Sequence, residues 1–557
     1  MTKKNFGKPP RTAYSLGGTE AENDWLLQDS FYESAQYQQI ISRDDRKCFL
    51  VGRTGAGKSA ILTRLEEENP EHIVRIDPDN LSLPYITSLD VIRYLTDLGV
   101  QLDHFFNALW KHVLLIEIIR HRYQVDSEEA KNRFLALISE KIKRDRSKQL
   151  ALQYLEDFEG RFWVETDERV REITDRLESQ IKDEAGVAIG NSIGKINLGA
   201  SDTVLASSQE RTELAARFQR IINDTQMARL NQMIKVLDSD ILDSSGHFTY
   251  VVIDDLDKDW VDESISNDLI RCLFRAVNDL KKVQNLKVIV ALRTNIFDYL
   301  DFGPKGGQEE KYRALTIRLR WTHADIERLL TERVKAAGLK FDTHGVSKLT
   351  DVLPSTNKTR GDALAFILRR TLMRPRDAIS YLNECYQLNG GRPRISWDCI
   401  HQAQPYYSRG RLLALRDEWK PTFPGIDRVF ELFRGASVKM DQDEFRKRLD
   451  EAVLLMADSG FSGTVWMTKL GEPILNSTDT DDWSEVYQPL TRMLFEIGFI
   501  GGSDRSSSHA VWSYEDPGFS ESKSNLRAKH SVAPQRRRHT PTPRCDVRGG
   551  CTAFGGV

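Results

Sequence analysis

The sequence predicts an α/β fold of three layers, in which a parallel sheet carries helices on both faces. Three observations lead to this prediction. A glycine-rich stretch, residues 52–59, stands between an apolar run and a helix-forming segment. Two later apolar runs end in polar residues, the first in Asp254 and the second in Arg293. Helix-forming segments separate these runs, and such alternation is typical of a doubly wound parallel sheet.

The glycine-rich stretch fits the phosphate-binding P-loop pattern G-x-x-x-x-G-K-[ST] without a mismatch. Its residues are Gly52, Arg53, Thr54, Gly55, Ala56, Gly57, Lys58 and Ser59. An apolar strand, 48–51, precedes the loop, and a helix that Asn69 and Pro70 end follows it. Backbone N–H groups from Gly55 to Ala60 would cradle a phosphate where the helix dipole adds positive charge. A plain glycine-rich turn is the alternative interpretation.

Composition limits the class of protein. With 557 residues the chain is long enough for several domains, and 40% hydrophobic with 29% charged residues is typical of soluble globular proteins. The net charge of -3 gives no overall attraction to nucleic acid or membranes. Six scattered cysteines without a C-x-x-C pair favour reduced thiols in the cytoplasm and give no zinc site. The apolar segment 104–121 contains charged residues, which favours a buried core helix over a membrane span.

We divide the chain into seven parts from these patterns. They are an N-terminal segment (1–44), the first part of a P-loop NTPase core (45–88), a large helical insertion (89–240), the second part of the core (241–321), a helical lid (322–390), a winged-helix candidate (391–520) and a basic disordered tail (521–557). Core strands are expected at 48–51, 72–76, 248–253 and 286–292, with one more within 312–321. Glycines punctuate 185–201, which suits a hairpin or loop.

The end of the chain carries two weaker patterns. Helical segments are followed by a strand that ends near Ile500, a glycine-rich turn and a strand at 510–514, an order that suits a winged helix. The tail holds eight Lys or Arg against two acidic residues, a net charge of +6. We expect a solvated, disordered tail, with nonspecific contact to RNA or DNA as the alternative.

Phosphoryl transfer requires charge neutralisation and positioning, and the motifs supply residues for both. Lys58 would reach the β- and γ-phosphates of a nucleotide, and Ser59 would hold Mg²⁺. Asp254 follows a buried strand, which is the position expected for a carboxylate that supports the metal together with Ser59. Asp255 is the candidate base for the attacking water, and Asp257 competes for that role. Surface charge and helix capping are the alternative explanation for this acidic cluster.

Two arginines complete the predicted site. Arg293 ends the strand after the acidic cluster and could stabilise charge on the γ-phosphate. Arg376 lies in the run Arg-Pro-Arg-Asp at a helix start, from which it could close over the nucleotide. An ordinary strand end and ordinary helix-start chemistry are the alternatives. The run 357–359, Asn-Lys-Thr, lacks the Asp of a guanine-reading N-K-x-D motif, so we expect ATP as the nucleotide.

Taken together, these motifs resemble the additional-strand P-loop ATPases near the AAA+ and STAND groups. The resemblance is carried by 52–59, 251–257, 291–295 and 374–377. More closely, the chain resembles a bacterial P-loop ATPase family found near mobile elements and phage-defence genes, over roughly residues 15 to 520. The sequence segments that it shares with that family are 52–60, 109–114, 253–260 and 310–312.

The resemblance implies an ATPase with a sensor-1 residue at Arg293 and a sensor-2 residue at Arg376. It also implies a homo-oligomer, because such ATPases commonly complete the site with an arginine from a neighbour. Arg313, Arg318 and Arg320 are the candidates for that arginine. AAA+ proteins commonly have an Asp-Glu pair where this chain has Asp254 and Asp255, which favours slow or switch-like hydrolysis. The tail after about residue 525 differs from the apolar C-terminal end of the bacterial family.

Three functions are consistent with these residues. The first is an ATP-driven switch in bacterial defence or signalling that acts on a separate effector protein. The second is a DNA-binding ATPase that holds duplex with the winged helix. The third is a nucleotide-binding scaffold with little turnover. No nuclease or protease triad is apparent in the sequence, and no membrane partner is expected.

Overall fold

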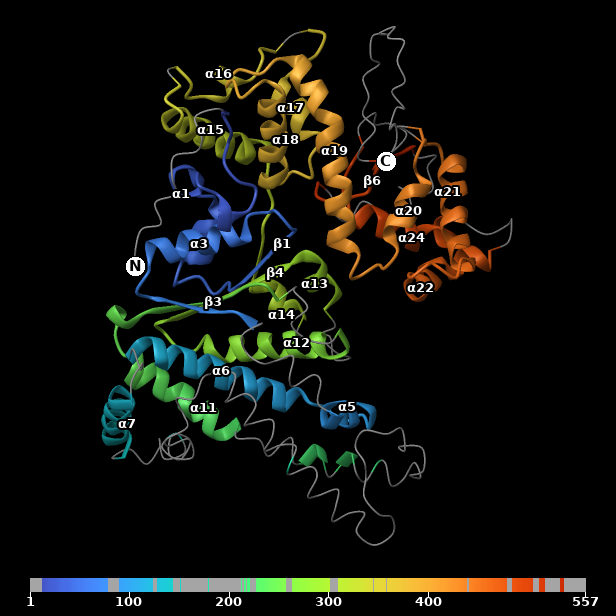
Figure 1. The fold of residues 1–557 in the computed structure, drawn as a ribbon. Helices are drawn as coiled ribbons and strands as arrows, with labels where there is room; N and C mark the ends of the chain where they lie inside the picture. The colour runs from blue at the N-terminus through green and yellow to red at the C-terminus, as the bar shows by residue number, and fades with distance from the viewer. Residues whose placement is uncertain are drawn as a thin grey trace. The chain divides into compact units, whose positions relative to one another are not determined.

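The computed structural model describes the chain as two compact units (Figure 1). The sheet unit comprises Glu33–Arg53 and Gly57–Leu319, and the helical unit comprises the described residues of Met1–Tyr32, Thr54–Ala56 and Arg320–Val557. The predicted N-terminal segment 1–44 is therefore divided after Tyr32. The described residues are 13–78, 90–123, 128–143, 151, 179, 212, 215–216, 218–220, 227–256, 263–300, 309–343, 345–356, 358–437, 440–477, 483–503, 510–515 and 531–534.

The sheet unit is built on five parallel strands in the order β2-β3-β4-β1-β5. The register pairs Gly52 with Arg293 and Ile253 with Val290. β4 therefore lies between β1, which leads into the glycine-rich loop, and β3, which leads to Asp254. The predicted parallel α/β sheet is confirmed. Its strands are β1 (Phe49–Gly52), β2 (Ile73–Ile76), β3 (Thr249–Ile253), β4 (Leu286–Arg293) and β5 (Thr316–Arg318).

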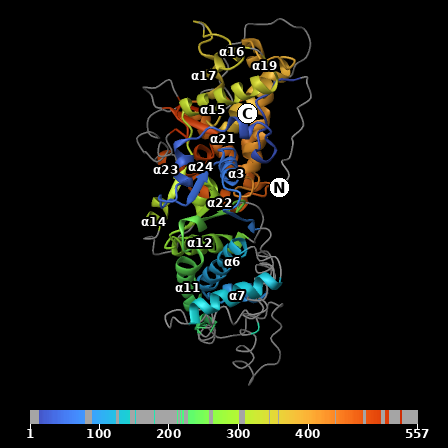
Figure 2. The same cartoon turned by 90° about the vertical axis from the view of Figure 1, so that its left-hand side faces the viewer.

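Helices cover both faces of this sheet. Phe49 and Val51 of β1 belong to a hydrophobic core shared with α6 and α12, whereas Leu50 between them is buried outside that core. This alternation follows from the period of two in a strand. Figures 1 and 2 both place α3 on the side of the sheet opposite α6 and α12. These helices span Lys58–Glu68 (α3), Asp103–Tyr123 (α6) and Glu263–Leu280 (α12).

A buried lysine attaches the helical insertion to the sheet layer. Lys111 of α6 donates a hydrogen bond of 2.8 Å to Asn231 and forms an ion pair of 2.6 Å with Asp279 of α12. A charge in a core requires such partners, so α6, α11 and α12 are held together at this point. The glycine-punctuated part, 185–201, lies outside the described residues. The other helices of the sheet unit are α2 (Ala35–Ile41), α5 (Asp90–Asp97), α7 (Glu128–Lys143), α11 (Met227–Val236), α13 (Thr294–Tyr299) and α14 (Glu309–Ala314).

The apolar segment 104–121 forms most of α6 and is buried nearly throughout. This agrees with the predicted core helix. Among the described helices, none has the length and apolar content that a membrane-crossing segment needs.

The helical unit begins with a bundle that has its own core. Tyr14 and Leu16 of the N-terminal segment pack into this core, and Arg333 of α15 binds Asp24 at 2.6 Å. Tyr407 of α19 belongs to it as well, so the bundle extends past residue 390, where the predicted lid ends. The helices are α1 (Leu27–Ser30), α15 (His323–Lys340), α16 (Leu349–Val352), α17 (Ala363–Leu368), α18 (Pro375–Leu388) and α19 (Trp397–Trp419).

A second core follows in the same unit, and the last residues of α19 enter it. Leu415 and Trp419 pack with Phe423 and Phe430 there. These C-terminal helices are α20 (Ile426–Leu432), α21 (Gln442–Leu454), α22 (Thr464–Leu475), α23 (Trp483–Val486) and α24 (Gln488–Glu496).

Two antiparallel strands close the described chain, and one of them was not expected. β6 (Ile500–Ser503) pairs with β7 (Ser531–Pro534). The strand predicted at 510–514 contributes a single bridge, between Val511 and Gly502. β7 lies within the tail 521–557 that we expected to be disordered, and its four residues pair with β6. The rest of the tail lies outside the described residues, and the winged helix stays a prediction.

Candidate phosphate-binding site

Two glycines let the chain turn between β1 and α3. Gly55 has a φ of 78° and Gly57 a φ of 97°, values that residues with a Cβ rarely adopt. Gly57 is the N-cap of α3, so the helix starts directly after it at Lys58. The amino end of an 11-residue helix therefore stands at the predicted phosphate site.

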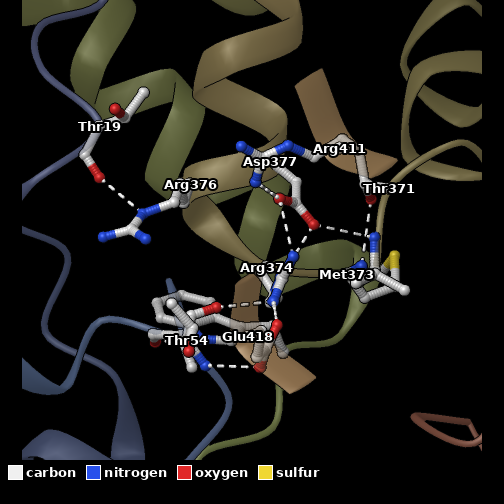
Figure 3. Close-up of polar contacts among 12 residues, drawn as sticks. Thr19, Thr54, Thr371, Met373, Arg374, Arg376, Asp377, Arg411 and Glu418 are labelled. Atoms are coloured by element: carbon white, nitrogen blue, oxygen red, sulfur yellow. Dashed lines mark hydrogen bonds and ion pairs between the residues drawn. The ribbon is translucent and has the colours of Figure 1, made fainter. Parts of the chain in front are cut away.

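The carbonyl groups of the loop are held by donors of the helical unit. The Thr54 carbonyl accepts a hydrogen bond from Arg374 Nη1 at 2.7 Å (Figure 3). The Gly55 carbonyl accepts from the N–H of Arg376 at 3.4 Å, and the Ala56 carbonyl accepts from Trp321 Nε1 at 2.8 Å. Because each peptide unit is trans and planar, the N–H that follows a carbonyl points in the opposite direction.

The corresponding N–H groups belong to Gly55, Ala56 and Gly57. Among the residues that the structure describes, none of these three N–H groups has a hydrogen-bond partner. The hydroxyl of Thr54 is buried and lacks a partner among the same residues. Unpaired polar groups are rare inside proteins unless a ligand or water completes them. The loop thus has a row of donors suited to an anion.

Lys58 adds a positive charge to the loop. Its side chain is buried, and its Nζ donates to the carbonyl of Gly52 at 2.9 Å and to that of Arg53 at 3.5 Å. The ammonium therefore lies within the turn, where a phosphate oxygen could replace the carbonyls as its acceptor.

Ser59 and Asp254 are brought together by the fold of the sheet unit. The Ser59 hydroxyl donates a hydrogen bond of 3.2 Å to Asp254 Oδ2. Burial raises the pKa of the Asp254 carboxyl, and the Asp255 carboxylate raises it further, while the Asp255 N–H, Lys58 and Arg75 lower it. A hydroxyl and a carboxylate are oxygen ligands of the kind that Mg²⁺ takes, so the pair fits that ion.

Asp255 has an unusual backbone conformation. Its φ is 61°, in the left-handed region, and its N–H donates to Asp254 Oδ1 at 2.9 Å. Such a conformation costs on the order of 1–2 kcal/mol for a residue with a Cβ and is often found at functional sites. The hydrogen bond holds the Asp254 carboxylate in place. Asp257, the competing candidate for the base, lies outside the described residues.

Two arginines of the sheet unit belong to the strands on either side of β3. Arg293 is the last residue of β4, beside Gly52 in the register. Arg75 of β2 pairs with Glu66 at 2.9 Å, and Asp254 and Asp255 help to raise the pKa of its guanidinium against the effect of burial. The sequence did not single out Arg75, because a polar residue inside an apolar strand normally faces solvent.

Arg376 lies against the loop within the helical unit. A Cβ placed on Gly55 would stand 2.8 Å from the Cβ of Arg376. Arg376 Nε donates to the carbonyl of Thr19 at 3.0 Å, while its Nη atoms have no partner among the described residues (Figure 3). Burial lowers the pKa of Arg376, and Arg374 and Arg411 lower it further. A group placed in this way would gain from a nearby anion.

Two further residues bind the loop, and the sequence did not identify either as a site residue. Arg374, noted only as part of a helix start, is buried and donates to Thr54. Glu418 of α19 accepts a hydrogen bond from the Thr54 N–H at 3.3 Å. Glu418 lies in a charged run, Arg-Asp-Glu, that resembles a solvated helix face, so no local signal marked it.

Of the three arginines considered for a neighbouring subunit's site, Arg318 is engaged within its own unit. It forms an ion pair of 2.5 Å with Asp298 and lies 5.2 Å from the centre of the Phe297 ring.

Comparison with known proteins adds a family match for part of the chain. Residues 324–416, from α15 to α19, match the model of the FunZ-associated C-terminal helical domain. The matched range includes Arg374, Arg376 and Arg411 of the helical unit.

Two curated proteins are similar to the chain. It is 23% identical over 516 residues to the transposon gamma-delta 80.3 kDa protein of Escherichia coli K12, an alignment that covers 88% of this chain and 62% of that protein. The chain thus spans less than two thirds of this relative's length. A stretch of 146 residues, 26% of the chain, is 27% identical to 76% of allergen Alt a 2 of Alternaria alternata.

Among solved structures, the chain is similar to the Aeropyrum pernix ORC1 protein in complex with DNA. The identity is 11% and the TM-score 0.32, with 95% of each chain covered.

Proposed function

We propose that the chain binds ATP at Gly52–Ala60 and hydrolyses it with Mg²⁺, and that this reaction drives a conformational or oligomeric switch. The observation that carries the proposal is the orientation of the loop. Its carbonyls are bonded at Thr54, Gly55 and Ala56, while the opposed N–H groups of residues 55–57 have no partner among the described residues. Together with Lys58, they provide the donors that a polyphosphate requires.

The residues of the sheet unit have distinct roles in this proposal. Lys58 would bind the β- and γ-phosphates, and Ser59 and Asp254 would hold Mg²⁺, which neutralises charge on the phosphate oxygens. Asp255 would orient the attacking water and accept its proton. Arg293 would stabilise the charge that develops as the γ-phosphoryl group leaves. The strand order supports the additional-strand class, since β4 separates the loop strand from the Asp254 strand.

In this proposal, Arg376 of the helical unit would bind the nucleotide. Its guanidinium has Nη atoms without a partner among the described residues and could bind a phosphate beside Gly55. Assembly into a homo-oligomer and action on a separate effector protein belong to the same proposal. Similarity to a protein named for a transposon supports a link to bacterial mobile elements, and a role in phage defence or signalling stays our hypothesis.

ATP turnover with and without duplex DNA tests the proposal. The variants are Lys58→Ala, Asp255→Ala and, as a control, Lys469→Ala at an exposed position of α22. We expect each site variant to lower kcat by about 100-fold or more, as when a preorganised charge or donor is removed from an active site. The control should keep the wild-type rate.

Two outcomes would change the proposal. Turnover that Lys58→Ala leaves unaffected would reject the ATPase. Turnover that duplex stimulates, together with DNA binding, would favour the DNA-dependent ATPase over the effector switch, and binding of ATP with almost no turnover would favour a scaffold.

A further inference from the structure

A charge-balanced network, buried except for Arg411, lies beside the phosphate-binding loop in the helical unit. We call Arg374, Asp377, Arg411 and Glu418 the Thr54 network. Arg374 donates from Nε and Nη2 to the Asp377 carboxylate at 2.9 and 3.2 Å, and from Nη1 to Glu418 at 3.2 Å. Arg411 donates to Asp377 at 2.7 Å. Two positive and two negative side chains balance, which is the condition for keeping charges in a core.

This network holds both polar backbone groups of Thr54. Arg374 donates to its carbonyl at 2.7 Å, and Glu418 accepts from its N–H at 3.3 Å (Figure 3). Any rotation of this part of the loop must therefore break a charge-assisted hydrogen bond on one side or the other.

Hydrogen bonds within the helical unit hold the turn before Arg374 in the absence of a ligand. Met373 has a φ of 50°, which is strained for a residue with a side chain, and its N–H donates to Thr371 Oγ1 at 3.1 Å. The N–H of Leu372 donates to Asp377 Oδ2 at 3.0 Å. Since these contacts hold the turn, Arg374 reaches Thr54 without having to be ordered by a ligand.

Helix α19 connects this network to the C-terminal helices. Its first half packs in the bundle core through Tyr407, and its last residues pack in the second core through Leu415 and Trp419. Glu418 directly precedes Trp419, whose ring stacks on Phe423 at 5.9 Å. A displacement of Glu418 therefore acts directly on a residue that anchors the C-terminal core.

We propose that Arg374 and Glu418 are positioning residues of the phosphate-binding loop, and that α19 transmits the state of the loop to the C-terminal helices α20–α22. The inference rests on the proposed binding of ATP. A bound triphosphate places several negative charges at the loop to which the Glu418 carboxylate is bonded. Like charges repel, so the contact between Glu418 and Thr54 weakens when the nucleotide enters. Glu418 then shifts toward Arg374 and takes the end of α19 with it.

Hydrogen exchange of the full chain, followed by mass spectrometry, tests this transmission. Wild type, Glu418→Gln, Lys58→Ala and the control Glu472→Gln, an exposed carboxylate on α22, are compared with and without Mg²⁺ and a non-hydrolysable ATP analogue. For each protein, the concentration of the ATP analogue is one that saturates that protein in a separate binding titration. We expect the analogue to change exchange in residues 415–475 of wild type and of the control by about fivefold, the lower end of typical coupling between sites. In Glu418→Gln, which keeps the shape but not the charge, the change should be lost.

Two results would overturn the inference while the proposed ATP binding stands. In the first, wild type binds the analogue but exchange in residues 415–475 stays unchanged. In the second, Glu418→Gln shows the full wild-type change. If wild type and Lys58→Ala instead give the same titration without binding, the proposed function itself has failed, and the inference falls with it.

Kinetics of Arg374→Lys separate positioning from a merely structural role. Lysine keeps the charge but lacks the planar fork with which Arg374 binds the Asp377 carboxylate through two atoms while it also donates to Glu418 and Thr54. We expect the KM for ATP to rise about tenfold, corresponding to one charge-assisted hydrogen bond, with a smaller change in kcat. A loss of folded protein alone would lower the apparent kcat and leave KM unchanged, and that result would reject the positioning role of Arg374.

Discussion

The hydroxyl of Ser59 donates a hydrogen bond of 3.2 Å to the carboxylate of Asp254, although 195 positions separate the two residues. The contact exists because β1 and β3 run parallel with β4 between them, so their carboxyl ends open at one edge of the sheet. A ligand site at such an edge is common in doubly wound folds. The same contact places a hydroxyl and a carboxylate beside each other at the amino end of α3.

Asp254→Asn should separate activity from stability. Burial raises the pKa of Asp254, so its ionised form is unfavourable in the protein without a ligand. An amide of the same shape can still accept the N–H of Asp255 but is a poor Mg²⁺ ligand. We expect kcat for ATP to fall by about 100-fold or more, with thermal stability equal to or above that of wild type.

Turnover measured across a Mg²⁺ titration, together with thermal unfolding, checks this expectation. Glu472→Gln, the same chemical change at an exposed position of α22, serves as control and should match wild type in both measurements. Full activity of Asp254→Asn at ordinary Mg²⁺ concentrations would contradict the role of Asp254 in metal binding.

Gly55→Ala should impair nucleotide binding through a clash with Arg376. The new Cβ would stand 2.8 Å from the Cβ of Arg376, and the φ of 78° is itself unfavourable for alanine. We expect ATP affinity to fall by about tenfold or more, since overpacking typically costs 1–3 kcal/mol. Isothermal titration measures the effect.

Gly345→Ala is the matched control for the cost of placing alanine at a positive φ. Gly345 also has a φ of 78°, but a Cβ there would meet no atom within 4 Å. This variant should lose about 1 kcal/mol of stability and keep its affinity for ATP. Equal affinities for both alanine variants would show that the contact between Gly55 and Arg376 does not matter for binding.

The sequence predicted the parts of the site that depend on local pattern. Lys58 and Ser59 lie in a motif of eight contiguous residues, and Asp254 and Arg293 follow apolar strands, so strand order alone brings them to one sheet edge. Glu418 was missed because its contact with Thr54 joins residues 364 positions apart, and no periodicity encodes such a pairing.

The boundaries of the helical unit were harder to predict for a different reason. The composition shifts beyond about residue 394, so the sequence suggested a new domain after residue 390, although Tyr407 of α19 packs into the core of the preceding bundle. β7 was missed because Ser531–Pro534 lies among basic and polar residues, and only pairing with β6 makes it a strand.

Gly410→Ala should stabilise the protein. Gly410 lies in α19 between the residues of the two cores, and a Cβ there would meet no atom within 4 Å. Alanine in a helix interior is favoured over glycine by about 0.5–1 kcal/mol. Urea unfolding followed by circular dichroism should therefore show a higher midpoint for the transition of the helical unit.

A second helical glycine gives the matched control for this stabilisation. At Gly471 of α22 a Cβ would stand 2.8 Å from Val453 Cγ2, so Gly471→Ala should destabilise by about 1–3 kcal/mol. A fall in stability for Gly410→Ala would mean that the backbone of α19 is not helical at this position in solution.

We expect the pH dependence of the free energy of unfolding to change when Arg411 is replaced, because Arg411 lowers the pKa of Asp377. Burial alone would raise the pKa of the Asp377 carboxyl, but Arg374, Arg411 and two hydrogen bonds hold it below its usual value. A carboxyl whose pKa is lower in the folded than in the unfolded chain stabilises the fold above the unfolded pKa of about 3.9. This contribution is lost as the pH falls through the lower, folded pKa.

In Arg411→Met, Asp377 keeps Arg374 but loses one charged donor, so its folded pKa moves up toward the unfolded value. We expect a loss of about 1–3 kcal/mol near neutral pH and a shrinking difference from wild type as the pH falls below about 4. Urea unfolding of both proteins at several pH values measures this difference.

Arg416→Met, which removes an arginine from an exposed pair on the same helix, should show a much smaller effect at every pH. A difference between wild type and Arg411→Met that stays constant as the pH falls through the folded pKa of Asp377 would show that Arg411 acts through packing, because a charge interaction with Asp377 must vanish once that carboxyl is protonated.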